Sequence, residues 1–89
     1  MHYLVNVTFV PGQREAMATH MAAEQAHVRE LRKQGVIQAI HIAADRSHVW
    51  LVLRGESEDQ VRQTMAAFPL YPYMELDLTP LLELEPAAL

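Results

Sequence analysis

The chain has 89 residues, 51% of them hydrophobic, and a formal net charge of -4 at pH 7. That length suits one domain spanning residues 1–89, and the acidic balance argues against nucleic acid or an anionic membrane as a partner. Because the chain has no cysteine, it has neither disulfides nor a thiolate nucleophile. The hydrophobic content exceeds what a small monomer needs inside, so we expect a homodimer or a higher homo-oligomer.

The sequence carries no sign of membrane insertion or export. No apolar run is long enough to span a bilayer, so we expect no membrane partner. The first residues, Met1 to Leu4, lack the basic region and the small-residue cleavage site of a signal peptide. We therefore expect a cytoplasmic protein.

The first part of the chain predicts a strand followed by a long helix. Apolar and polar residues alternate from Tyr3 to Phe9, which is typical of a strand, and Pro11-Gly12 ends the pattern. Helix-forming residues dominate from Arg14 to about Gln34 and include one apolar stripe. Gly35 follows a basic last turn, which predicts a C-terminal helix cap there.

The middle of the chain predicts a hairpin and then a second helix. Val36 to Ala43 is rich in β-branched residues, and Asp45-Arg46-Ser47 is typical of a short hairpin connection. His48 to Arg54 predicts the next strand, apolar on both faces in its middle. Ser57, followed by acidic residues, predicts the N-cap of the second helix.

A proline-rich segment leads into the last predicted strand. The segment from Phe68 to Met74 contains two prolines, and each restricts both its own backbone and the residue before it. We therefore expect a rigid, extended connector there. Met74 to Thr79 then alternates strictly between apolar and polar residues, as in a half-buried strand. Residues 81–89 form a C-terminal tail with too little pattern to assign.

The predicted order is strand, helix, strand, strand, helix, strand. With right-handed crossovers, this order predicts an α+β fold, a ferredoxin-like βαββαβ split sheet with both helices on one face. The helices cover only one face, while the second and third strands are apolar on both. We therefore predict a dimer that packs sheet against sheet.

The predicted long helix carries the best catalytic candidates. His20, Glu24 and His27 lie along one stripe at the border of its apolar face. A carboxylate at the edge of an apolar cleft has a raised pKa, so Glu24 is the candidate base. His27 and His41 are candidate donors or alternative bases, because imidazole titrates near neutrality. The purely structural roles that compete with these are a solvated Glu24, a packed His27 with a satisfied ring nitrogen, and a His41 on the dimer face.

Further residues are candidates for binding a substrate. Phe68, Tyr71 and Tyr73 form either a pocket wall or a well-packed turn, and the tyrosine hydroxyls suit a substrate carbonyl. His20 is the fourth candidate for substrate binding. His20, Glu24 and His27 also suggest a metal site, but the two histidines lie two turns apart and nothing completes the shell. We therefore expect neither a metal nor another cofactor.

Two features of the chain resemble the muconolactone isomerase family. One is the run FPLYPYM, from Phe68 to Met74, before an acidic alternating strand, and the other is the helix end with Glu24, Leu31 and Gly35. The resemblance covers Met1 to Leu81. It implies a dimeric α+β barrel, often assembled into larger rings. It also implies the cofactor-free isomerisation of muconolactone to the enol-lactone of 3-oxoadipate, in catechol degradation, with an acid at the position of Glu24.

The strand after Gly35 departs from that family. There the resemblance implies Trp, Arg and His side chains suited to a carboxylate substrate, whereas this chain has the mostly apolar segment Val36 to Ala39. Such a segment suits a less charged ligand. Two further functions therefore stay open beside the isomerase: another small-molecule enzyme, such as a cofactor-free oxygenase or dehalogenase, and a non-catalytic binding module.

Overall fold

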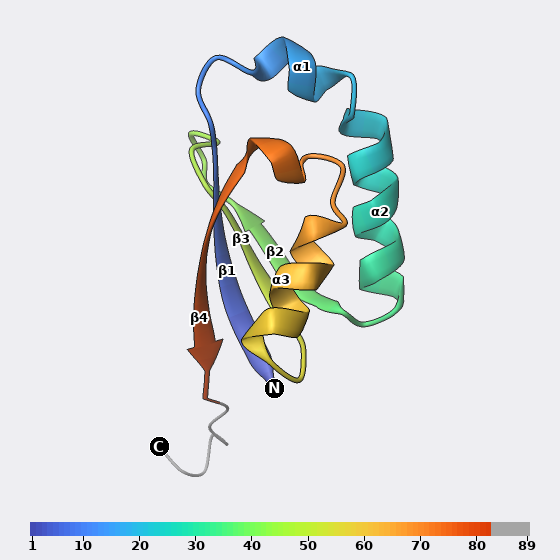
Figure 1. The fold of residues 1–89 in the computed structure, drawn as a ribbon, viewed down its shortest axis with the longest axis vertical. Helices are drawn as coiled ribbons and strands as arrows, with labels where there is room; N and C mark the ends of the chain where they lie inside the picture. The colour runs from blue at the N-terminus through green and yellow to red at the C-terminus, as the bar shows by residue number, and fades with distance from the viewer. Residues whose placement is uncertain (83–89) are drawn as a thin grey trace.

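In the computed structural model, which describes residues 1–82, four strands form one antiparallel sheet in the order β2-β3-β1-β4. Helices α2 and α3 lie side by side on one face of this sheet (Figure 1). This is the predicted ferredoxin-like α+β arrangement. The elements are β1 His2–Phe9, α1 Arg14–Ala18, α2 Met21–Lys33, β2 Ile37–Ile42, β3 Val49–Arg54, α3 Glu58–Ala66, the 3₁₀ turn η1 Tyr71–Tyr73 and β4 Met74–Leu81.

The core lies between the sheet and the two helices. Alternate residues of each central strand point into it, because successive side chains of a strand face opposite sides of a sheet. The fully buried side chains come from β1, β3 and α3, and they are Val5, Val7, Leu53, Val61 and Met65. No helix within residues 1–82 combines the length and the apolar character needed to cross a bilayer.

The prediction of one helix from Arg14 to Gln34 was wrong, because the chain turns between α1 and α2. The Thr19 hydroxyl donates a hydrogen bond to the Ala16 carbonyl at 2.8 Å, and the His20 N–H donates to the Met17 carbonyl at 2.9 Å. Such side-chain bonds compete with the regular helix ladder. His20 therefore precedes α2 as its N-cap residue and does not lie inside one long helix with Glu24.

The predicted C-terminal cap at Gly35 and the predicted N-cap at Ser57 are both confirmed. Gly35 has a φ of 76°, and its N–H donates to the Arg32 carbonyl at 3.1 Å. The Val36 N–H donates to the Leu31 carbonyl at 3.0 Å, so α2 ends in a Schellman-type cap. At the other helix, the Ser57 hydroxyl accepts a hydrogen bond from the Gln60 N–H at 3.1 Å.

The prediction of an extended connector from Phe68 to Met74 was also wrong. The Tyr71 N–H donates to the Phe68 carbonyl and the Tyr73 N–H donates to the Leu70 carbonyl, both at 2.9 Å. These bonds make consecutive tight turns that end in η1. The φ that proline imposes suits the first turn of a helix as well as an extended chain, and here the turn prevails.

Strand β4 forms one edge of the sheet and runs further than predicted. It pairs with β1 from Met74 opposite Phe9 to Leu81 opposite His2. Pro80 lies within this pairing, and an edge strand tolerates a residue without an N–H. The expected tail therefore begins inside the strand, and its residues 83–89 lie outside the described part of the chain.

Candidate functional site

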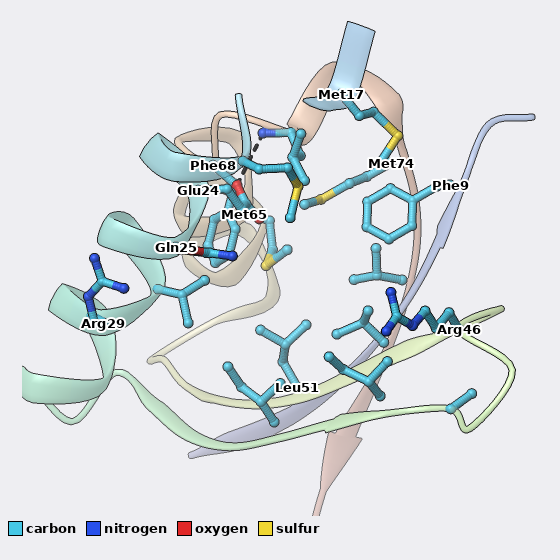
Figure 2. Close-up of a pocket in the computed structure, with 18 of the residues that line it drawn as sticks. Phe9, Met17, Glu24, Gln25, Arg29, Arg46, Leu51, Met65, Phe68 and Met74 are labelled. Atoms are coloured by element: carbon cyan, nitrogen blue, oxygen red, sulfur yellow. Dashed lines mark hydrogen bonds between the residues drawn. The ribbon is translucent and has the colours of Figure 1, made fainter. Parts of the chain in front are cut away.

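A cleft of about 870 Å³ opens between α2 and the helix-covered face of the sheet. This volume suits a small molecule. Figure 2 shows that most of its lining is hydrocarbon, with a few charged groups at the rim. The lining residues include Val7 and Phe9 of β1, Met17, Met21, Glu24, Gln25 and Val28 on the α1–α2 side, Ile40 and Ile42 of β2, Leu51 of β3, and Met65, Phe68, Leu70 and Met74.

Glu24 is the one buried charged side chain among residues 1–82, with 9% of its surface exposed. Its Oε1 accepts a hydrogen bond from the Leu70 N–H at 3.1 Å, the dashed line of Figure 2. Burial raises the pKa of the Glu24 carboxyl, and the Leu70 N–H and the nearby His27 imidazole only partly offset that rise. The site therefore contains a carboxylate of increased basicity beside an apolar cleft, as predicted.

The turns after α3 bring Leu70 to Glu24. Phe68 and Leu70 are both 3% exposed, so this segment is anchored in the core by two apolar side chains. The anchoring presents the Leu70 N–H to a helix that lies 46 residues earlier in the chain. One carboxylate oxygen is thereby held, while no further hydrogen bond of the carboxylate to residues 1–82 is seen.

His27 lies one turn after Glu24 but does not line the cleft. Its ring packs edge-on against Phe68, with the ring centroids 4.8 Å apart and the planes at 85°. Its Nε2 is buried and has no hydrogen-bond partner within the described residues. His27 thus packs against Phe68, but the satisfied ring nitrogen expected for a packing role is not found, and an unpaired buried nitrogen carries a desolvation cost.

The remaining aromatic candidates lie beside the site. Tyr71 is 40% exposed, and neither Tyr71 nor Tyr73 lines the cleft. His20 is exposed at the start of α2, with its ring centroid 6.1 Å from that of Tyr73. Of the four residues expected to bind substrate, Phe68 alone reaches the lining.

A bulge in β2 decides where His41 points. The pairing register between β2 and β3 shifts between Ile37 and Ala39, so Ile40 pairs with Leu51 and His41 with Trp50. Without the extra residue, simple alternation from the buried Ile37 would turn His41 toward the cleft. With it, Ile40 and Ile42 line the cleft and His41 lies on the other face. The structure thus brings Glu24 and Phe68 to the cleft and leaves His41 outside it.

Comparison with known proteins identifies the family. The family model described as muconolactone delta-isomerase matches residues 1–85. The chain belongs to the muconolactone delta-isomerase family. A search of curated proteins found no match.

Two solved structures of the same fold are similar to this member of the family. A crystal structure of muconolactone isomerase is 21% identical with a TM-score of 0.78, and the match covers 98% of this chain and 93% of that one. The 5-chloro-2-hydroxyhydroquinone dehydrochlorinase TftG of Burkholderia phenoliruptrix AC1100, in complex with 2,5-dihydroxybenzoquinone, is 18% identical with a TM-score of 0.74. That match covers 91% of this chain and 93% of TftG. At these identities the likeness shows the shared fold.

Sequence reasoning missed the polar rim of the cleft. Gln25, Arg29 and Arg32 come from α2, and Arg46 comes from the hairpin between β2 and β3. The helix residues follow Met21 at intervals of three or four, so helical spacing could have placed them on the stripe that faces the cleft. Arg46 has no such local signal. Among residues 1–82, no group of three or more His, Asp or Glu side chains is placed to hold a metal ion.

Proposed function

We propose that this protein is a small-molecule isomerase that shifts a proton within a lactone such as muconolactone, without a cofactor, and that Glu24 carries the proton. The observation that supports this most is the buried carboxylate beside an apolar cleft, with one oxygen held by the Leu70 N–H and its pKa raised. Membership of the muconolactone delta-isomerase family supports the same reaction. We propose a role in aromatic degradation and a cytoplasmic location.

The proposed reaction uses Glu24 twice. The carboxylate first takes an allylic proton from the lactone, and the electrons of the broken C–H bond move into a dienolate on the lactone carbonyl. The resulting carboxylic acid then returns the proton to a different carbon of the dienolate, which shifts the double bond and restores the carboxylate. A raised pKa makes the first step easier. The hydrogen bond from Leu70 holds the carboxylate in place through both steps.

An assay of muconolactone isomerisation tests this proposal. Glu24→Gln preserves the size of the side chain and an oxygen that accepts from Leu70, but it removes the base. We expect kcat to fall by about 10²- to 10⁴-fold. Glu30→Gln is the matched control, because Glu30 is exposed on the same helix and does not line the cleft. An inactive wild-type protein, or a fully active Glu24→Gln variant, would reject the proposal.

A dehydrochlorination in the same cleft is the second candidate. The fold shared with TftG and the largely apolar lining favour it over an oxygenase reaction. In that reaction Glu24 takes a proton from the substrate while the carbon–chlorine bond breaks and chloride leaves with its electron pair. Chloride release from 5-chloro-2-hydroxyhydroquinone, without muconolactone turnover, would select this candidate. Absence of both activities would favour a binding module.

We also propose that the protein forms a homodimer through the face of the sheet that the helices leave uncovered. Leu4, Trp50 and Val52 alternate with buried core residues on β1 and β3 and therefore lie on this outer face. A dimer would bury these apolar side chains. We expect Trp50→Glu to lower the mass measured by light scattering to that of a monomer. Gln63→Glu, which adds the same charge on exposed α3, should leave the mass unchanged, and an unchanged mass for Trp50→Glu would contradict the proposal.

A further inference from the structure

Arg46 occupies an unusual position at the mouth of the cleft. It lies in the hairpin between β2 and β3 and has a φ of 64°, a left-handed conformation that residues other than glycine rarely adopt. Its backbone N–H donates to the Ala43 carbonyl at 2.8 Å, which closes the turn. Strained backbone of this kind is concentrated at active sites and ligand-binding segments.

The charge of Arg46 has no counter-charge within residues 1–82. The adjacent acid, Asp45, instead accepts hydrogen bonds from the Ser47 N–H at 2.9 Å and the Ser47 hydroxyl at 2.6 Å. Glu24, the acid that lines the cleft, accepts a hydrogen bond from the Leu70 N–H instead. No hydrogen bond or ion pair joins the Arg46 guanidinium to the described residues.

Arg46 and Arg29 lie at opposite rims of the cleft. Figure 2 shows the Arg46 side chain running from the hairpin back over the sheet, whereas Arg29 stays on α2. Arg46 additionally lines a second hollow of about 620 Å³, which shares Met17 and Met21 with the cleft. Arg46 therefore lines both hollows.

We infer that Arg46 binds the anionic group of the substrate and makes the cleft selective for small organic acids. The inference rests on the proposed function, because it concerns the same cleft in which Glu24 acts. A guanidinium can bind a carboxylate through two parallel N–H bonds, which orients the ligand as well as attracting it. The acid is held at the hairpin, and its ring extends over the apolar lining toward Glu24.

Binding to matched pairs of acids and neutral analogues tests this inference. The probes are muconolactone with its methyl ester and benzoate with benzamide, titrated calorimetrically into wild type and Arg46→Gln. All proteins carry Glu24→Gln, so that no probe is turned over. We expect Arg46→Gln to weaken binding of at least one acid by about tenfold or more, and to leave its neutral analogue unchanged. Arg46→Lys should restore part of the loss, which separates a charge effect from a disturbed turn.

Arg62→Gln is the control for a general loss of positive charge. Arg62 lies on α3, pairs with Glu58 at 3.0 Å and does not line the cleft. Acids should bind this variant as tightly as they bind wild type. The inference is overturned if no acid binds wild type more tightly than Arg46→Gln, or if the neutral analogues weaken equally.

Turnover separates this inference from the proposed function. In the active background, Arg46→Gln should raise KM for muconolactone by about tenfold and change kcat little. If Glu24→Gln is inactive but Arg46→Gln keeps the KM of wild type, the role of Arg46 is refuted and the role of Glu24 stands. If Glu24→Gln is fully active but acid binding still depends on Arg46, the role of Glu24 is refuted and the role of Arg46 stands.

Discussion

The two faces of the sheet are built from the same strands and differ in what they contact. On β3, Leu51 and Leu53 point toward the helices and are 3% and 0% exposed, whereas Trp50 and Val52, which alternate with them, point to the outer face. The helix-covered face holds the cleft and the buried Glu24. Alternation along a strand therefore defines two sets of residues, but packing decides which set lines the cleft.

The imidazoles of His41, in β2, and His48, directly before β3, belong to the outer face. His41 pairs with Trp50, and the His48 ring stacks on the Trp50 ring with centroids 5.3 Å apart. The His48 Nδ1 lies 3.0 Å from the Asn6 Oδ1, which joins β3 to β1 on that face. These contacts keep His41 and His48 away from the cleft that Glu24 lines.

The largest expected effect comes from breaking the helix-covered face of β3. Leu53→Ala removes a fully buried side chain and leaves a cavity, so we expect the free energy of unfolding to fall by about 3 kcal/mol. Val52→Ala, its neighbour on the outer face, is the matched control and should cost less than about 1 kcal/mol in a monomeric background such as Trp50→Glu. Urea denaturation of both variants measures the difference. Equal losses would mean that the two faces do not differ in packing.

The second prediction concerns the pH dependence of stability. Because burial raises the pKa of Glu24 in the folded state, the carboxyl favours folding at low pH, and this contribution is lost as pH rises through its folded-state pKa. Wild type should therefore lose stability relative to Glu24→Gln over that interval and then level off. Urea denaturation across the pH series measures this difference. A difference that does not change with pH would show that burial does not perturb Glu24.

The pKa of Glu24 also sets the pH at which the proposed activity appears, on the acidic side of the pH–activity profile. Activity should rise with pH as Glu24 loses its proton, with a midpoint above the usual range of a glutamate. The profile of kcat/KM for muconolactone measures this midpoint in the free protein. A midpoint at the ordinary pKa of a glutamate would show that the catalytic base is not the buried Glu24 carboxyl.

The smallest expected effect is at His27. His27→Leu removes a buried, unpartnered Nε2 while retaining apolar contact with Phe68, so we expect a gain in stability of about 1 kcal/mol. It also removes the imidazole that lowers the pKa of Glu24, so the low-pH limb should move upward. His20→Leu, at an exposed position, is the control. Loss of activity without a shift of the limb would instead support a catalytic His27.

Much of the fold could be predicted because its signals are local. The alternation of β1, the glycine after α2 and the serine before α3 each act through neighbouring residues, and all three are confirmed. The break at Thr19, whose hydroxyl donates to the Ala16 carbonyl, was missed because good helix formers lie on both sides of it. The turns at Pro69 and Pro72 were missed because proline permits both a helical and an extended backbone.

The sequence by itself determined that Glu24 borders an apolar helix face and that apolar residues alternate along the strands, because both follow from the period of one element. Only the tertiary structure decided that Leu70 holds Glu24, that one extra residue in β2 turns His41 outward, and that Arg46 reaches over the cleft. These features depend on register and on contacts between distant segments. No local period of the chain encodes them.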